Sequence, residues 1–297
     1  MAGVRRLPAW EERLKAKFIE AKEAIERLAP EPLRRGADIA RVVLAFEELP
    51  RAMDFLRKLL DNPFPYLSGP LPNGTVVLAR RLSQAKGRFG RRWEAKEGGL
   101  WMALAFYDDL LPEVKGWFPI LFGLAVTKAL QALGAPVALK WINDVHLAKQ
   151  KICGVLIEQA VCRGETWSLV GLGINVNNEP PEEVPALSLR QILGHELSLE
   201  GVFGRVLAEI AKFYGLFKEY EAKLLEARYE ENKPLNPLLE AFLALSDTLG
   251  ERIFFGHNLD LEYEIGWAKD ISSTGALIIE TPQGEMEFLS GEIAYLS

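Results

Sequence analysis

The sequence predicts an α+β protein made of two unequal parts behind a short helical arm. In the larger part, apolar runs of strand length alternate with longer helical patterns. From Ile253 onward the runs shorten and glycines separate them, which is typical of a small β-barrel. Pro234 and Pro237 mark the change between the two patterns. The expected units are an arm at residues 1–40, a larger domain at 41–245 and a barrel domain at 246–297.

The arm is predicted to contain one charged amphipathic helix over residues 11–28, ending before Pro30. Its apolar stripe consists of Leu14, Phe18, Ile25 and Leu28. A single helix lacks the helix–turn–helix spacing that docks in a DNA groove. The whole chain is also acidic, with a formal net charge of −6 at pH 7. We therefore expect the arm to pack against the protein and not to bind DNA.

The two larger units are predicted element by element from their apolar patterns. Strands of the larger domain are expected at residues 41–46, 75–79, 100–106, 137–139, 155–157 and 168–173. Its helices are expected at residues 50–60, 118–133 and 199–218, with Gly134 closing the second helix. The barrel strands are expected at residues 253–255, 261–265, 275–280 and 286–288.

Length and composition exclude several classes of protein. A chain of 297 residues with 49% hydrophobic residues can bury one good core and a smaller domain. Only two cysteines occur, Cys153 and Cys162, so no disulfide framework is indicated. No apolar run approaches the length of a membrane span, and a signal-peptide pattern is missing at the N-terminus. We expect a protein of the reducing cytoplasm.

Two lysines near the ends of predicted strands are the first candidate site. Lys140 begins the segment Lys140-Trp141-Ile142-Asn143-Asp144, and Lys151 begins Lys151-Ile152-Cys153-Gly154-Val155-Leu156-Ile157-Glu158. The two are expected on neighbouring strands joined by a short turn, where they could converge on one anionic group. Asn143 and Asp144 could add a polar contact or a metal ligand. Taken alone, such lysines are more often solvated surface residues.

Two glycine-containing segments flank the lysines in sequence. Upstream, Gly87-Arg88-Phe89-Gly90-Arg91-Arg92-Trp93 combines a backbone that can approach a phosphate with several positive charges. Downstream, Gly171-Leu172-Gly173-Ile174-Asn175-Val176-Asn177 places two asparagines on alternate positions, from which they could contact a nucleotide or a phosphate. The competing interpretations are a solvated basic loop and a simple turn signal.

The order of these motifs resembles the biotin protein ligase family, whose signatures are GRGRxGRxW, KWPND, KxxG and GxGINVN. The resemblance covers roughly residues 42–297, and the four motifs in one order are far more specific than any one alone. It implies a biotin/lipoate ligase-like fold, in which helices back a mixed β-sheet that carries catalysis. It also implies an SH3-like C-terminal barrel.

The resemblance further implies chemistry in two steps. A carboxylate, which the resemblance implies to be biotin, attacks ATP to give an acyl-adenylate. A lysine of a biotin carboxyl carrier-type protein then takes the acyl group. The implied catalytic cations are Lys140, Lys151 and Arg88, with Asp144 as a ligand of Mg²⁺ or a residue that orients Lys140. The implied nucleotide-binding residues are Gly87, Arg88, Gly90, Arg91, Trp93, Asn143, Asn175 and Asn177.

The motifs depart from the family where biotin is read. The family's Ser-Thr pair is replaced by Arg51 and Ala52, and the place of its glutamine holds Leu82, with Gln84 two residues away. Biotin should therefore bind weakly unless other polar groups substitute, because an unpaired polar group in a dry pocket costs roughly 1–3 kcal/mol. The expected acyl-pocket residues are Arg51, Ala52, Leu82, Ser83, Gln84, Lys86, Gly154, Gly171 and Gly173.

Three hypotheses follow from this mixture of agreement and departure. The first is a biotin-type ligase with a diverged pocket. The second is the same chemistry on lipoate or a fatty acid, which an apolar Leu82 favours. The third is a non-catalytic ligand-binding regulator of the same fold. The retained lysines and Arg88 disfavour it, because burying a cation costs free energy and a protein without catalysis has little physical need of one. The sequence leaves the oligomeric state open, although a sheet edge beside the barrel offers one route to a homodimer.

Overall fold

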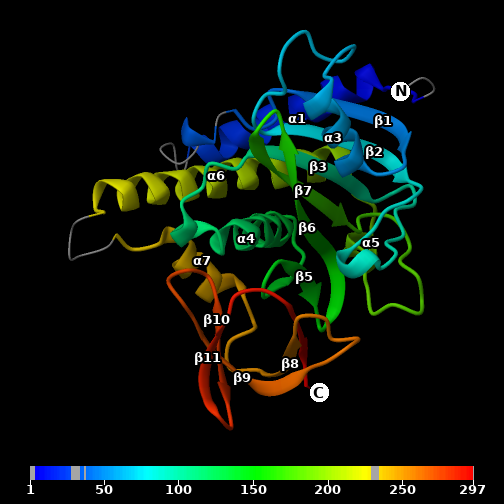
Figure 1. The fold of residues 1–297 in the computed structure, drawn as a ribbon. Helices are drawn as coiled ribbons and strands as arrows, with labels where there is room; N and C mark the ends of the chain where they lie inside the picture. The colour runs from blue at the N-terminus through cyan, green and yellow to red at the C-terminus, as the bar shows by residue number, and fades with distance from the viewer. Residues whose placement is uncertain (1–3, 28–33, 37, 229–233, 297) are drawn as a thin grey trace.

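The computed structural model describes residues 4–27, 34–36, 38–228 and 234–296. Two sheets organise this part of the chain, a seven-stranded sheet and a five-stranded sheet (Figure 1). The larger sheet runs in the order β1-β2-β3-β7-β6-β5-β4. Its strands are β1 (Val43–Leu49), β2 (Thr75–Leu82), β3 (Leu100–Tyr107), β4 (Ala138–Lys140), β5 (Asp144–Leu147), β6 (Gln150–Cys162) and β7 (Glu165–Ile174).

The larger sheet is mixed, as the sequence predicts. Strands β1 and β2 pair in parallel, and every other neighbouring pair is antiparallel. The parallel pair requires a crossover, which α3 (Ala52–Asp61) supplies. Alternate residues of β1 enter opposite cores: Val43 and Ala45 join the larger core, whereas Leu44 and Phe46 join the core under α3.

Helices cover both faces of this sheet. The larger core contains the apolar faces of α4 (Trp117–Ala132) and α6 (Leu199–Glu226), which lie together on one face in Figure 1. The smaller core packs α3 against the other face. The remaining helical segments are α5 (Leu189–Leu193), α7 (Pro237–Leu245) and the short 3₁₀ turns η1 (Arg88–Gly90) and η2 (Pro112–Val114).

The N-terminal helix α1 (Pro8–Glu26) is part of the larger core. It begins three residues earlier than predicted, and Leu28 of the predicted stripe lies outside the described residues. The apolar residues Trp10, Leu14, Phe18 and Ile25 are buried. Gly204 of α6 allows the close approach, since a Cβ there would lie 2.4 Å from the carbonyl oxygen of Lys17. The helix thus packs on the domain, as expected.

Replacing Leu14 of α1 by alanine is expected to lower the free energy of unfolding by about 2–4 kcal/mol, because a fully buried leucine leaves a cavity when truncated. Ile19→Ala on the same helix is the matched control, since Ile19 is 54% exposed and should change stability by less than about 0.5 kcal/mol. Denaturant unfolding measures both variants. Equal effects of the two substitutions would contradict the packing of α1 described above.

The five-stranded sheet follows α7 and forms the C-terminal domain, which lies below the larger sheet in Figure 1. Its order is β11-β10-β9-β8-β12, and all its pairs are antiparallel. This agrees with the expected SH3-like barrel. Its strands are β8 (Arg252–Gly256), β9 (Glu264–Ile271), β10 (Leu277–Thr281), β11 (Gly284–Phe288) and β12 (Glu292–Tyr295).

Two details of this domain differ from the prediction. The strand expected at residues 261–265 begins only at Glu264, because Leu261 closes a turn by donating its backbone N–H to the carbonyl of Asn258 (3.0 Å). The strand β12 was not predicted at all. Trp117, the first residue of α4, reaches into the domain, where its Nε1 donates to the carbonyl of Ser273 (2.8 Å). The two domains therefore share a packed interface.

Candidate functional site

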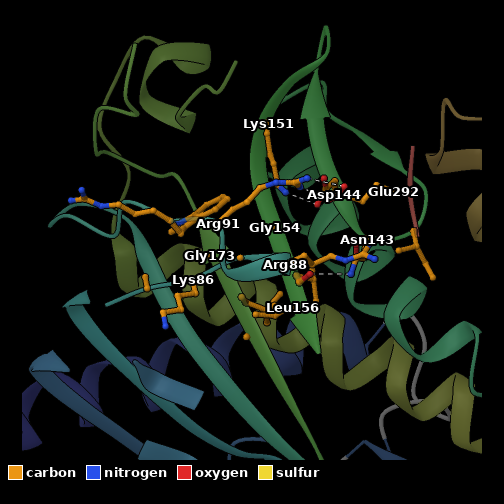
Figure 2. A pocket seen from close by; sticks show the side chains of 18 of the residues that line it. Lys86, Arg88, Arg91, Asn143, Asp144, Lys151, Gly154, Leu156, Gly173 and Glu292 are labelled. Carbon is orange, nitrogen blue, oxygen red and sulfur yellow. Dashed lines mark hydrogen bonds and ion pairs between the residues drawn. The ribbon is translucent and has the colours of Figure 1, made fainter. Parts of the chain in front are cut away.

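One cavity of about 480 Å³ brings most of the predicted residues together between the two domains. Its floor is the β6–β7 pair, and its walls come from the glycine–arginine loop, the N-terminus of α3 and the C-terminal domain (Figure 2). Predicted residues that line it are Arg51, Ala52, Leu82, Lys86, Gly87, Arg88, Arg91, Trp93, Lys140, Asn143, Asp144, Lys151, Gly154, Gly171 and Gly173.

The two lysines meet around one carboxylate. Lys151 Nζ lies 2.7 Å from Asp144 Oδ1, and Figure 2 shows these side chains joined. The sequence predicts Lys140 and Lys151 on neighbouring strands, and this is wrong, because β5 lies between β4 and β6. The inserted strand positions the carboxylate, because Asp144 is the first residue of β5 and is paired with Lys140 of β4.

Electrostatics at this cluster favour a fixed negative charge between two cations. Burial raises the pKa of Asp144, but Lys151 and Lys140 outweigh burial and leave that pKa below its ordinary value. Burial lowers the pKa of Lys140, and the charge of Lys151 lowers it further, although Asp144 and Glu292 act in the opposite direction. Asp144 is therefore ionised at neutral pH, and it helps Lys140 to remain protonated.

The lowered pKa of Lys140 predicts the alkaline limb of the activity profile. Any reaction that needs the charged amine should decline as pH rises through the folded-state pKa, at pH values below the ordinary lysine value of 10.5. Lys140→Arg should shift this limb to higher pH, because arginine stays charged throughout the range. Initial rates measured across the pH range for both proteins test this. An alkaline limb that the substitution leaves in place would exclude Lys140 as its source.

The side chains of this cavity do not form a site that would hold a magnesium ion by protein ligands alone. Asp144, the predicted ligand, is already the counterion of Lys151, and Asn143 uses its amide to donate to the carbonyl of Val155 (2.9 Å). Within the described residues, no group of three or more His, Cys, Asp and Glu side chains gathers. Magnesium prefers several oxygen ligands around it, without a competing ammonium group. The structure thus gives Asp144 the role of counterion.

The glycine–arginine loop is fastened to the C-terminal domain. Arg91 donates from Nε to Asp260 Oδ2 (2.9 Å), from Nη2 to Asn258 Oδ1 (3.1 Å) and from both terminal nitrogens to Glu292. Arg88 Nη1 donates to the carbonyl of Gly291 (2.5 Å). We call the set formed by Arg91, Asn258, Asp260 and Glu292 the loop latch. It holds the basic loop over the cavity.

Glycines keep the floor of the cavity open beneath the loop. Gly154 and Gly173 face each other across β6 and β7, and Trp93 lies over both of them. A Cβ at Gly154 would lie 3.1 Å from Lys151 Nζ, and a Cβ at Gly173 would lie 3.1 Å from Trp93 Nε1. Side chains at these two positions would crowd the lysine and the indole. The glycines therefore leave room beside the cationic cluster.

The opposite end of the cavity is closed by a charged network. Arg51 precedes α3 and donates to Asp54 Oδ1 (3.1 Å) and to both carboxylate oxygens of Glu158. Arg57 binds the same two acids, donating to Glu158 Oε2 (2.7 Å) and to Asp54 Oδ1 (3.0 Å). The predicted departure from a Ser-Thr pair therefore leaves a guanidinium, and not a purely apolar wall, at this end.

Some predicted residues lie elsewhere. Ser83, Gln84 and Gly90 line a separate surface depression, which Lys86 shares with the main cavity. Ser83 and Gln84 follow the end of β2 at Leu82, and they line that depression and not the main cavity. They are therefore not available as substitutes for the missing polar groups.

The structure places Asn175 and Asn177, for which a nucleotide role is predicted, outside the lining of the main cavity. Neither residue is among those lining the cavity, since β7 ends at Ile174 and the expected alternation stops there. Asn175 Oδ1 accepts from Asn178 Nδ2 (2.9 Å). The amide of Asn177 bonds to the backbone of Leu197 at both its nitrogen (2.8 Å) and its oxygen (2.9 Å). Both side chains brace the loop after β7.

The sequence prediction missed the contribution of the C-terminal domain to the cavity. Glu292 and Asp260 approach the cavity from that domain, although nothing near them in sequence indicates a site. The cavity residues from this domain are Leu259, Asp260, Gly291, Glu292, Ile293 and Ala294.

Comparison with known proteins finds similarity to biotin ligases. The model of the biotin/lipoate A/B protein ligase family matches residues 65–177. The chain is 29% identical over 231 residues to the bifunctional ligase/repressor BirA of Bacillus subtilis, a match covering 75% of this chain and 66% of that protein. It is 28% identical over 240 residues to the biotin–[acetyl-CoA-carboxylase] ligase of Mycobacterium tuberculosis, covering 77% of this chain and 82% of that protein. The chain thus spans about two thirds of the length of the Bacillus relative.

A solved structure agrees with these matches over both domains. The biotin protein ligase from Aquifex aeolicus, in complex with biotin and ATP, superposes with a TM-score of 0.66 at 27% sequence identity. The match covers 86% of this chain and 99% of the Aquifex chain. The motif order, the mixed sheet with its C-terminal barrel and the lysine-lined cavity agree with these findings. Residues 65–177 thus match the biotin/lipoate A/B protein ligase family, and the similarity to biotin ligases extends over both domains.

Proposed function

We propose that this protein is an ATP-dependent ligase that adenylates biotin and transfers it to a lysine of a biotin carboxyl carrier-type protein. One observation carries the proposal: Lys140, Lys151 and Arg88 line one cavity whose floor is kept open by Gly154 and Gly173. Relatives named as biotin ligases, and a similar structure that holds biotin and ATP, support biotin as the carboxylate.

In the first half-reaction, a carboxylate oxygen of biotin attacks the α-phosphorus of ATP. The new P–O bond forms as the bond to pyrophosphate breaks, and negative charge accumulates on the phosphoryl oxygens. Lys140 and Lys151 supply fixed positive charge where this develops, and Asp144 holds Lys151 in place. Arg88 adds a third cation from the loop.

In the second half-reaction, the amine of the carrier lysine attacks the acyl carbonyl carbon of the adenylate. The C–N bond forms, the C–O bond to AMP breaks, and the amine releases a proton. The same cations stabilise the departing AMP phosphate. Between the two steps the mixed anhydride must be kept from water. The loop latch supports this requirement, because it holds Arg88 and Arg91 over the cavity.

The setting of this activity follows from a few other features. Cys153 and Cys162 are both free and buried thiols, which supports the reducing cytoplasm as the place of action. Among the residues that the structure describes, no helix combines the length and apolar character needed to cross a membrane. The apolar stripe of α1 is occupied by the core, which supports activity without DNA binding by the N-terminal segment.

Pyrophosphate exchange followed by acyl transfer tests the proposal. With biotin and ATP, the protein should exchange labelled pyrophosphate, and mass spectrometry should find one biotinyl group on the lysine of a biotin carboxyl carrier domain. Exchange with lipoate or octanoate but not with biotin would assign the same chemistry to another carboxylate. A lack of exchange with all three would leave a binding protein and contradict the proposal.

A further inference from the structure

Strand β6 sets the order of the residues along the cavity floor. Gly154, Leu156 and Glu158 lie on one face of β6, since side chains alternate along a strand. The first of these positions is beside Lys151, the second is paired with Gly171 and the third binds Arg51. Four strand residues span about 13 Å. The cationic cluster and Arg51 therefore stand at opposite ends of one trough.

Arg51 closes the far end of this trough as a nearly buried cation. Its side chain is 12% exposed and lines the cavity. A guanidinium has five N–H donors. Nη1 and Nη2 bond to Asp54, Glu158 and the sulfur of Met53. Among the hydrogen bonds of Arg51 to the described residues none uses Nε, so the group retains a donor for a ligand.

The charges around Arg51 indicate what kind of group it can bind. Two arginines, Arg51 and Arg57, face two acids, Asp54 and Glu158, so the network is balanced without a ligand. A second carboxylate at this end would leave an excess negative charge beside Glu158. An alkyl end would cover the guanidinium and offer no acceptor. A neutral carbonyl oxygen satisfies the donor and preserves the balance.

We propose that Arg51, held in place by Glu158, is the specificity-determining residue for the acyl group, and that it selects carboxylates whose far end carries a neutral hydrogen-bond acceptor. This proposal rests on the ligase function proposed above. The ureido carbonyl of biotin is such an acceptor. Octanoate has none, and pimelate carries a second anion. The Arg51 guanidinium therefore recognises the acyl group in place of the Ser-Thr pair that this chain lacks.

Arg57 offers a matched control because it binds the same acids from outside the cavity. It donates to Asp54 and Glu158, as Arg51 does, but it is not among the residues that line the cavity. Loss of either arginine leaves Glu158 with the other as its partner, so neither substitution strands a buried charge. A difference in ligand preference between the two variants therefore reports on contact of Arg51 with the ligand, and not on its support of the charged network.

Titration calorimetry on the full chain measures the preference directly and needs no turnover. Dissociation constants for biotin, octanoate and pimelate are compared in the parent, Arg51→Met and Arg57→Met, each checked for an unchanged melting temperature. In the parent, biotin should bind more tightly than either probe. Arg51→Met should reduce the biotin-to-octanoate preference about tenfold, while Arg57→Met should keep it within about twofold.

The outcomes separate this inference from the proposed function. An unchanged biotin-to-octanoate preference in Arg51→Met overturns the inference even when the parent is an active biotin ligase. A parent that prefers pimelate or octanoate overturns it as well. An equal loss of preference in both arginine variants assigns the effect to the network and rejects ligand contact by Arg51. Pyrophosphate exchange on the parent reports on the ligase function independently of all three results.

Discussion

Lys151→Ala and Lys140→Ala should each lower the rate of pyrophosphate exchange by at least about a thousandfold while leaving the protein folded. Both amines line the cavity beside Asp144. Their positive charge stabilises the negative charge that develops on the phosphoryl oxygens in the transition state. Loss of Lys151 also removes the ion-pair partner of Asp144. Lys140 is buried, and burial disfavours its charged form, so the fold should tolerate the loss of this amine.

Lys149→Ala is the control for this pair of substitutions. Lys149 lies on the same hairpin and is exposed, and its ammonium lies 5.8 Å from the ring centroid of Tyr295, outside the cavity lining. Its loss should change exchange by less than threefold. Exchange within a few-fold of the parent in either cavity variant would remove that lysine from the mechanism. Melting temperatures of all three variants show whether a loss of activity reflects unfolding.

The fold was predictable where local pattern and burial agree. Helix α4 differs from its predicted bounds by one residue at each end, and strand β3 by one residue at its C-terminal end, because long apolar runs have few alternatives. Strand β9 was misplaced because Leu261 and Tyr263 have strand-like character but are exposed in and after a turn. Apolar side chains on the surface carry no signal that separates them from a buried strand.

The cationic site was predictable for a different reason. The motifs around Lys140, Lys151 and Arg88 are each contiguous, and their chemistry is visible in residue type alone. The partners that complete the site are distant in sequence. Glu292 is 201 residues from Arg91, and Glu158 is 107 residues from Arg51. Without a fold, a single sequence gives no means of pairing such charges.

The asparagines show how far residue type alone can be taken. Asn175 and Asn177 were assigned to the nucleotide by their alternation after a predicted strand, but the strand ends at Ile174. Amides are also suited to satisfying loop backbone, and the contact of Asn177 with both polar groups of Leu197 is such a use. The residue type was informative, whereas the direction of its side chain depended on where the strand stopped.

The loop latch leads to a second large effect, on retention of the acyl-adenylate. Glu292 is the buried member of the latch, with its side chain 15% exposed, so its pairing with Arg91 is screened less than that of Asp260. Burial raises the pKa of Glu292, but Arg91 and the backbone N–H of Leu259 leave it below its ordinary value of 4.5. Its charge is therefore present at neutral pH and is lost only as pH falls through that lowered pKa.

Neutralising both acids with Glu292→Gln and Asp260→Asn should speed release of biotinyl-AMP roughly a hundredfold, since Arg91 would keep only neutral partners in the C-terminal domain. Tryptophan fluorescence in a stopped-flow displacement experiment follows the release, because Trp93 lies on the cavity floor. Release from the parent should accelerate with salt, and release from the double variant should not. Glu285→Gln, which affects the Lys269 pair on the same domain, should behave as the parent. Equal release rates and equal salt dependence in the parent and the double variant would show that the latch does not hold the loop closed over the adenylate.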